Sequence, residues 1–157
     1  MAGVVVTDAI IDQVKRHFAD TVPHNRALGL RLVEISESEI VSELPYDVKL
    51  IGNPDTGFLH GGAVTAQIDA TCGMAVPVKM RRVVPLATLD LRIDYLKPAR
   101  PGASVVCRAR CYKTTRNVAF VRATADCGDT SDPIASAAGS FIIFEDGVLP
   151  GEREAAE

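Results

Sequence analysis

The sequence predicts one α+β domain in which an antiparallel sheet of about six strands wraps around a central helix. Three observations lead to this fold class. Residues 61–76 form one long and mostly apolar helical segment, residues 88–95 alternate between apolar and polar side chains, and three more strand-like segments follow. The chain has 157 residues, of which 47% are hydrophobic, so it is long enough to bury a core of ordinary size.

The elements before the central helix are expected to be one helix, two strands and a loop. Apolar periodicity predicts a helix over residues 8–18, which Pro23 brings to an end, so residues 1–25 form an N-terminal helix and its lead-in. Alternation and turn residues then predict two strands, at residues 30–35 and 40–44. Clustered glycine, asparagine and proline predict a loop at residues 48–59.

The central helix is predicted over residues 61–76, with Pro77 as its stop. Four strands follow it, separated by proline, glycine and polar turn residues, at residues 88–95, 104–114, 118–127 and 134–144. The charged segment 151–157 has nothing to bury, and we expect it to be a disordered tail. No repeat or linker divides the chain, so residues 1–157 are expected to be a single domain.

Composition and motifs argue against several classes of function. The net charge of −3, with both signs scattered, gives no electrostatic support for nucleic-acid binding. The apolar runs are far shorter than the roughly 20 residues of a membrane-spanning helix, and the N-terminus lacks the basic region of a signal peptide. The four cysteines form no C-x-x-C pair and the three histidines show no metal-ligand spacing. We therefore expect a cytoplasmic protein without a metal, membrane or nucleic-acid partner.

The start of the central helix is the strongest candidate site in the chain. His60, Gly61 and Gly62 open the helix, and the two glycines can present their backbone N–H groups closely to a ligand. Asp69 lies two turns further on among apolar residues, where an unpaired carboxylate is costly. This combination indicates a catalytic site. The alternatives are a solvated or hydroxyl-bonded Asp69, a purely structural His60, and glycines that serve only helix packing.

Three motifs resemble those of PaaI-like (phenylacetate-pathway type) acyl-CoA thioesterases, which have the hotdog fold. The motifs are residues 53–62 leading to Asp69, residues 87–99, and residues 116–121. The resemblance implies hydrolysis of an acyl-CoA, with coenzyme A as part of the substrate and no separate cofactor. An acyl-carrier-protein thioester is the less favoured substrate, and the alternative function is a non-catalytic acyl-CoA-binding module of the same fold.

The resemblance also implies roles for individual residues. The Gly61 N–H polarises the thioester carbonyl, and Asp69 acts either as general base on a water or as nucleophile. Asn53 and His60 orient the water or the leaving thiolate, although Asn53 lies seven residues before His60 where some relatives have six. Thr88 supplies a hydroxyl that supports the acid or water from the partner chain.

Substrate contacts are expected at two further places. The phosphates of coenzyme A require cations, and the turn that contains Arg116 lies near the nucleotide in the family. Apolar residues at and after the helix start are candidates for an acyl pocket, and they include Met74, Val64 and Ile68. The residues predicted to bind substrate are Gly62, Phe58, Arg116, Asn117 and Val118.

Helix geometry constrains how these groups can act together. Gly61 and Asp69 are eight residues apart, which is about 12 Å along a helix, whereas attack requires the reacting atoms within about 3–3.5 Å. One helix therefore cannot both polarise a carbonyl with Gly61 and attack it with Asp69. Two copies of the helix could. The resemblance implies this arrangement, in a homodimer whose active sites lie at the subunit interface. Two such dimers often pair into a homotetramer, as a dimer of dimers.

Other hydrolytic and acyl-CoA chemistries fit the sequence less well. A serine hydrolase with a nucleophile elbow would need a Gly-x-Ser-x-Gly motif, which does not occur. Hydratases of the hotdog fold have an acid shortly before an Asn-Pro pair and a histidine directly after it. Here the histidine, His60, lies six residues beyond Pro54, and the acid is downstream. A thioesterase is therefore favoured.

Overall fold

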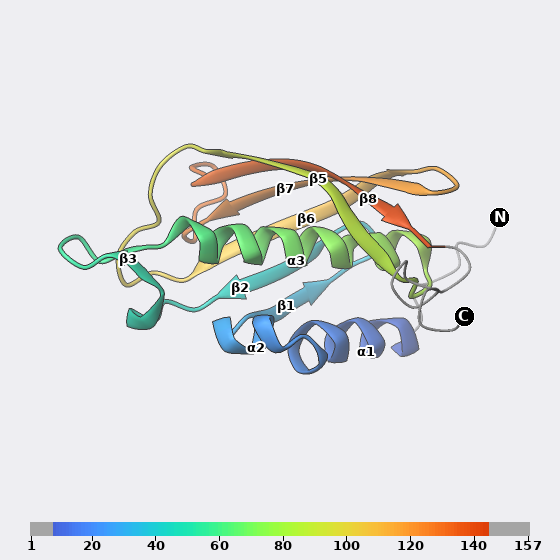
Figure 1. Ribbon diagram of the computed structural model, residues 1–157, viewed down its shortest axis with the longest axis horizontal. Coiled ribbons are helices and arrows are strands. Elements are labelled where there is room, and N and C mark those ends of the chain that lie inside the picture. The colour runs from blue at the N-terminus through green and yellow to red at the C-terminus, as the bar shows by residue number, and fades with distance from the viewer. Residues whose placement is uncertain (1–7, 145–157) are drawn as a thin grey trace, which may run out of the picture.

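A six-stranded antiparallel sheet lies against one long helix in the computed structural model, which describes residues 8–144 (Figure 1). The helix is α3 (Gly61–Met80). In spatial order the strands are β1 (Arg31–Ile35), β2 (Ile40–Leu44), β6 (Val105–Thr114), β7 (Val118–Asp126), β8 (Ala135–Ile143) and β5 (Leu86–Tyr95). The predicted fold class is confirmed. The tail expected at 151–157 lies outside the described residues.

Helix α3 packs on the sheet through side chains that recur every four residues. Val64, Ile68, Cys72 and Val76 are each at most 3% exposed, and a spacing of four keeps them on one face of the helix. The same helix contacts β6, β2 and β7 in the middle of the sheet. No helix among residues 8–144 is long and apolar enough to cross a membrane.

The prediction that Pro77 ends the central helix is wrong, because the helix continues to Met80. A proline in the final turn removes one backbone hydrogen bond, but Pro77 is buried here, so packing offsets that loss. The helix ends instead at Arg81, whose left-handed backbone (φ 57°) allows its N–H to bond the Val78 carbonyl. Tertiary contacts therefore set this boundary.

The N-terminal segment contains more helix than expected. Helix α1 (Asp8–Arg16) passes directly into a π-helical turn, η1 (His17–Thr21). The helix predicted over residues 8–18 is therefore confirmed, and it continues to Thr21. Pro23 separates this helix from a second one, α2 (Pro23–Leu28), because proline is well suited to the first position of a helix. Both α1 and α2 lie along the side of α3 (Figure 1).

The segment 48–59, expected to be a loop, holds a 3-10 turn, η2 (Val48–Leu50), and a short hairpin of β3 (Ile51–Asn53) and β4 (Phe58–Leu59). The base of this hairpin touches the start of α3. The His60 N–H donates to the Leu50 carbonyl at 2.8 Å. A Cβ added to Gly52 would lie 2.8 Å from His60 Cα, so only glycine fits that contact without a shift of the backbone. The hairpin thus holds the helix start in place.

Strand β5 forms one edge of the sheet and contains a bulge. Thr88 pairs with Phe141 and Asp90 with the preceding residue Ser140, so Leu89 is an extra residue on β5. The alternation predicted for this strand fails at that point, and Leu89 is 55% exposed instead of facing the core. Leu91 and Ile93, beyond the bulge, are half-buried as alternation predicts.

Candidate functional site

Asp69 and Thr88 form the centre of the candidate site. The Thr88 hydroxyl donates a hydrogen bond of 2.9 Å to Asp69 Oδ1. It is the only hydrogen bond of the Asp69 carboxylate among the described residues, and Asp69 itself is half-buried on α3. The bulge that follows Thr88 on β5 is the type of irregularity that re-aims a side chain near a functional site. This hydroxyl bonds the acid of its own chain, whereas the resemblance implies support from the partner chain.

A cavity of about 310 Å³ adjoins this pair. Its walls come from α3 and β5 on one side and from η1 and α2 on the other, and they include Asp69, Thr88, Met74, His17, His24 and Asn25. Sequence reasoning missed the last three residues. His17 and His24 carry no motif spacing, and the N-terminal 45 or so residues resemble the family only in outline.

His60 caps the start of α3. Its Nδ1 accepts the Gly62 N–H at 2.9 Å, so in the neutral ring the proton resides on Nε2. The Gly62 N–H, expected to assist in substrate binding, is therefore occupied. The Gly61 N–H makes no hydrogen bond among the described residues. Gly61 thus provides a free donor at the positive end of the helix dipole.

Tyr95 fastens the first turn of α3 to the end of β5, a contact that the sequence analysis missed. Its hydroxyl donates to the Gly61 carbonyl at 2.7 Å, and the Thr65 hydroxyl lies 3.0 Å from the same carbonyl and 2.7 Å from the Tyr95 hydroxyl. Tyr95 lies within one of the motifs, but alternation placed it on an apolar face. The two hydroxyls hold the peptide that follows the free Gly61 N–H.

Asn53 and Phe58 lie in the hairpin before α3. The Asn53 side-chain oxygen accepts the Asp55 N–H at 3.0 Å and helps to close the hairpin turn, which leaves its amide NH₂ group available. Phe58 is half-buried on β4. Val64 and Ile68, the proposed acyl-pocket residues on α3, are buried in the core and do not line the cavity beside Asp69.

The turn between β6 and β7 carries the remaining predicted contacts. Val118 pairs with Ile142, and Ile142 pairs with Ala87, the residue before Thr88. The turn therefore lies at the same end of the sheet as Thr88, two strands away. Arg116 and Asn117 are exposed at its tip. The Asn117 carbonyl accepts the Ile143 N–H at 2.8 Å, which ties the turn to β8.

The distance between the two key groups follows from the helix that joins them. Helix α3 runs without a break from Gly61 past Asp69, so the Gly61 N–H and the Asp69 carboxylate are separated by about 12 Å along the axis. Within one chain they cannot act on the same carbonyl.

The cysteines are free thiols, and none of them is among the described residues that line the cavity beside Asp69. Burial raises the pKa of Cys107 to about 12, and burial also raises the pKa of Cys72 far above its ordinary value. Neither thiol forms a nucleophilic thiolate near neutral pH. Within residues 8–144 no cluster of three His, Cys, Asp or Glu side chains has the arrangement to hold a metal ion.

Comparison with known proteins adds an independent line of evidence. The thioesterase superfamily model matches residues 56–134, which include Asp69 and Thr88. A Halobacterium salinarum protein named as an esterase is 32% identical over 126 residues, covering 76% of this chain and 83% of the relative. The medium/long-chain acyl-CoA thioesterase YigI of Salmonella typhimurium is 25% identical over 156 residues, covering 91% of this chain and 99% of YigI. A crystal structure of a Pseudomonas aeruginosa protein has a TM-score of 0.77 at 38% identity, covering 85% of this chain and 98% of that one.

Proposed function

Because the chain belongs to the thioesterase superfamily, we propose that this thioester hydrolase acts on an acyl-CoA and releases a free carboxylic acid and coenzyme A. The family match confirms the resemblance that the sequence motifs indicated. The proposal depends above all on the position of Asp69 at the wall of a cavity of about 310 Å³, where Thr88 bonds one carboxylate oxygen and the other has no hydrogen bond among the described residues. YigI, which matches nearly the whole chain, is named for this activity.

The proposed reaction adds one water to the thioester carbonyl and breaks the bond between the carbonyl carbon and sulfur. Asp69 either takes the proton of the attacking water or attacks the carbonyl itself to form a mixed anhydride, which water then cleaves. Negative charge develops on the carbonyl oxygen, and the free Gly61 N–H stabilises it at the positive end of α3. The thiolate takes up a proton as it leaves.

The proposed site combines two chains. Since about 12 Å of α3 separates Gly61 from Asp69 in one chain, Gly61 acts with Asp69 of the partner subunit in a homodimer. Strand β5 supports this assignment, because it ends the sheet and presents an edge with the exposed Leu89 to a second copy. Pairing of two such dimers into a tetramer stays a prediction, and so does a cytoplasmic location.

Substrate contacts are assigned to the residues around these two groups. Arg116, exposed in the β6–β7 turn, binds a phosphate of coenzyme A, and Asn117 and Val118 line the nucleotide beside it. The free amide group of Asn53 and Nε2 of His60 orient the water or the thiolate. Phe58 and Gly62 border the substrate at the hairpin and the helix start.

Release of free thiol from a panel of acyl-CoAs tests the proposal. We expect the native protein to release thiol, and Asp69→Asn and Asp69→Ala to lower kcat by about 100-fold or more, which is on the order of the usual contribution of a general base. Circular dichroism should show an intact fold in both variants. Asp55→Asn is the matched control, because Asp55 lies at the exposed tip of the hairpin, and it should retain native rates.

The outcomes separate the alternatives. Equal rates for the native protein and both Asp69 variants would refute the assignment of Asp69. Saturable acyl-CoA binding without thiol release would instead support a non-catalytic binding module. A single turnover in ¹⁸O-labelled water distinguishes the two roles of Asp69, because only the mixed anhydride can yield an unlabelled acid by transfer of an Asp69 oxygen.

A further inference from the structure

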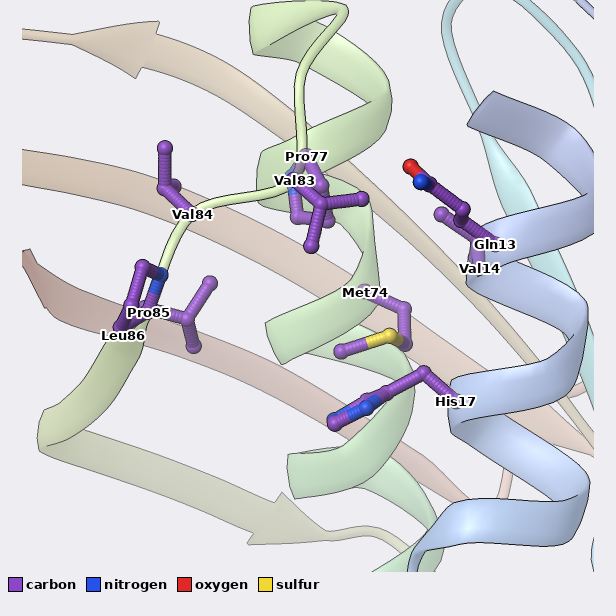
Figure 2. A pocket seen from close by; sticks show the side chains of 9 residues that line it. All are labelled: Gln13, Val14, His17, Met74, Pro77, Val83, Val84, Pro85 and Leu86. Carbon is purple, nitrogen blue, oxygen red and sulfur yellow. The ribbon is translucent and has the colours of Figure 1, made fainter. Parts of the chain in front are cut away.

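A second cavity, of about 370 Å³, lies between α1, the C-terminal half of α3 and the segment that leads into β5 (Figure 2). Of the nine described residues that line it, seven are apolar and the other two are Gln13 and His17. Its floor is formed by buried side chains, Val14, Pro77 and Val84, whereas Val83 at its rim is 50% exposed. We refer to this feature as the α1 groove.

The α1 groove continues the cavity beside Asp69. His17, Met74 and Leu86 line both cavities, so the two adjoin at these residues. Figure 2 shows His17 and Met74 next to each other, extending toward Leu86, while Pro77 and Val83 lie at the opposite end of the groove. A path therefore leads from the Asp69 carboxylate, past His17 and Met74, to Val83.

The π-helical turn contributes to this path. His17 is its first residue, and the widened turn η1 places His17 at the junction of the cavities and the buried Phe18 in the wall beside Asp69. Single π turns within α-helices are frequent at functional sites. This turn belongs to the N-terminal segment, for which the sequence motifs assigned no role.

We propose that the α1 groove holds the distal part of a straight aliphatic acyl chain, so that medium- and long-chain thioesters are the preferred substrates. This inference rests on the proposed function, because a thioester carbonyl at Asp69 has to place its acyl chain in the adjoining space. Among the described residues, the lining contains no carboxylate, lysine or arginine that could pair with a charged acyl group. Burial of each added methylene strengthens binding until the chain reaches Val83.

Non-hydrolysable thioethers test occupancy of the groove without requiring turnover. We suggest calorimetric titration of the native protein with S-butyl-, S-octyl- and S-dodecyl-CoA. Affinity should rise by about 4-fold per added methylene while the added carbons enter the groove. Rates of thiol release from the matching acyl-CoAs, measured in parallel, should favour the longer chains.

Val83→Phe places a bulky ring at the far end of the groove on an exposed position, where it leaves the core undisturbed. It should lower the ratio of dodecyl to butyl affinity by about 10-fold or more, because the chain end no longer fits. Val33→Phe is the matched control, since Val33 is 59% exposed on β1 and lines neither cavity. It should leave the ratio at its native value.

The two measurements separate this inference from the proposed function. Thioether affinities that depend on chain length and fall in Val83→Phe, without any thiol release, would uphold the groove and overturn the proposed function. If the protein releases thiol but its thioether affinities do not depend on chain length, only the inference about the groove would be overturned. The same holds if Val83→Phe leaves those affinities unchanged. If Val83→Phe changes the mass of the oligomer but not the ratio of dodecyl to butyl affinity, the inference would also be overturned, because the groove would then be a contact between copies of the chain.

Discussion

The Thr88 hydroxyl and the Asp69 carboxylate, which lie on different elements of one chain, are joined by a hydrogen bond of 2.9 Å. The bond fixes one carboxylate oxygen and leaves the other without a hydrogen bond among the described residues. A carboxylate held in this way has one oxygen free to meet a water or a carbonyl carbon. Thr88 is therefore a positioning residue for Asp69.

Thr88→Val should lower kcat by about tenfold, because it removes a hydrogen bond to a charged group and keeps the volume of the side chain. Thr88→Ser keeps the hydroxyl and should recover most of the rate. Thermal unfolding should change little in either variant, since Thr88 is exposed. A valine variant with native kcat would show that the bond has no part in catalysis.

Mixing two inactive variants should restore activity if each site combines two chains. Gly61→Pro deletes the free N–H at a helix position that favours proline, and Asp69→Asn disables the acid. A dimer with one copy of each variant contains one native site, so a fully exchanged equal mixture should regain about a quarter of the native activity.

The control for this mixing experiment is each variant mixed with itself under the same exchange conditions. Sites contained within single chains predict no recovery at all. Light scattering on the same samples gives the mass of the assembly and decides between a dimer and a tetramer.

His60→Ala should lower the free energy of unfolding by about 1 kcal/mol, because the Gly62 N–H loses its capping acceptor. His60→Asn restores a capping side chain and should recover most of that stability. If His60 also orients the water or the thiolate, the asparagine variant recovers stability without recovering kcat. Chemical denaturation and thiol release, measured on the same samples, separate these two roles. Equal stability of all three proteins would rule out a capping role.

Stability should fall as the pH rises above 9. Burial raises the pKa of Cys107 from 9.0 to about 12 and also raises the pKa of Cys72. Between pH 9.0 and about 12 the unfolded chain therefore releases thiol protons that the folded chain keeps, and each thiol lowers stability by up to about 1.4 kcal/mol per pH unit. Urea unfolding at several alkaline pH values measures this slope.

The double variant Cys72→Ala and Cys107→Ala is the comparison for the alkaline slope. It should be less stable than the native protein at neutral pH, because two buried side chains become smaller. Its stability should nevertheless depend less on pH above 9. An unchanged slope would assign the alkaline loss of stability to other groups.

Periodicity was a good guide to the sheet and a weaker one to the helix ends. All six strands of the large sheet begin and end within two residues of their predicted bounds, because alternation reflects which face is buried, whereas β3 and β4 lie in a segment predicted to be a loop. Pro77 does not end its helix, because breaker rules describe local preference and packing of the buried ring overrides it. The bulge at Leu89 could not be predicted, because the residues around it fit the alternation of a regular strand.

The sequence predicts site residues only where a motif carries them. Asp69 and Gly61 are predicted site residues because a carboxylate and bare glycines on one helix are unusual without a function, and their catalytic roles stay predictions. The sequence predicts only a general structural or orienting role for His60, and not its capping bond to the Gly62 N–H, since donor and acceptor geometry is not visible in a sequence. His17 and His24 reach the Asp69 cavity from about 50 residues away along the chain, and only the packing of η1 and α2 brings them there.

The close contact between Gly52 and the His60 backbone fixes the base of the hairpin, whereas its tip has no such constraint. Pro54, Asp55 and Thr56, at the far tip of the hairpin, are exposed. One more residue there would add little to the entropy cost of closing the loop. A residue added or removed between Pro54 and Thr56 should therefore leave the donor peptide at Gly61 anchored. Position 52 itself should tolerate no replacement.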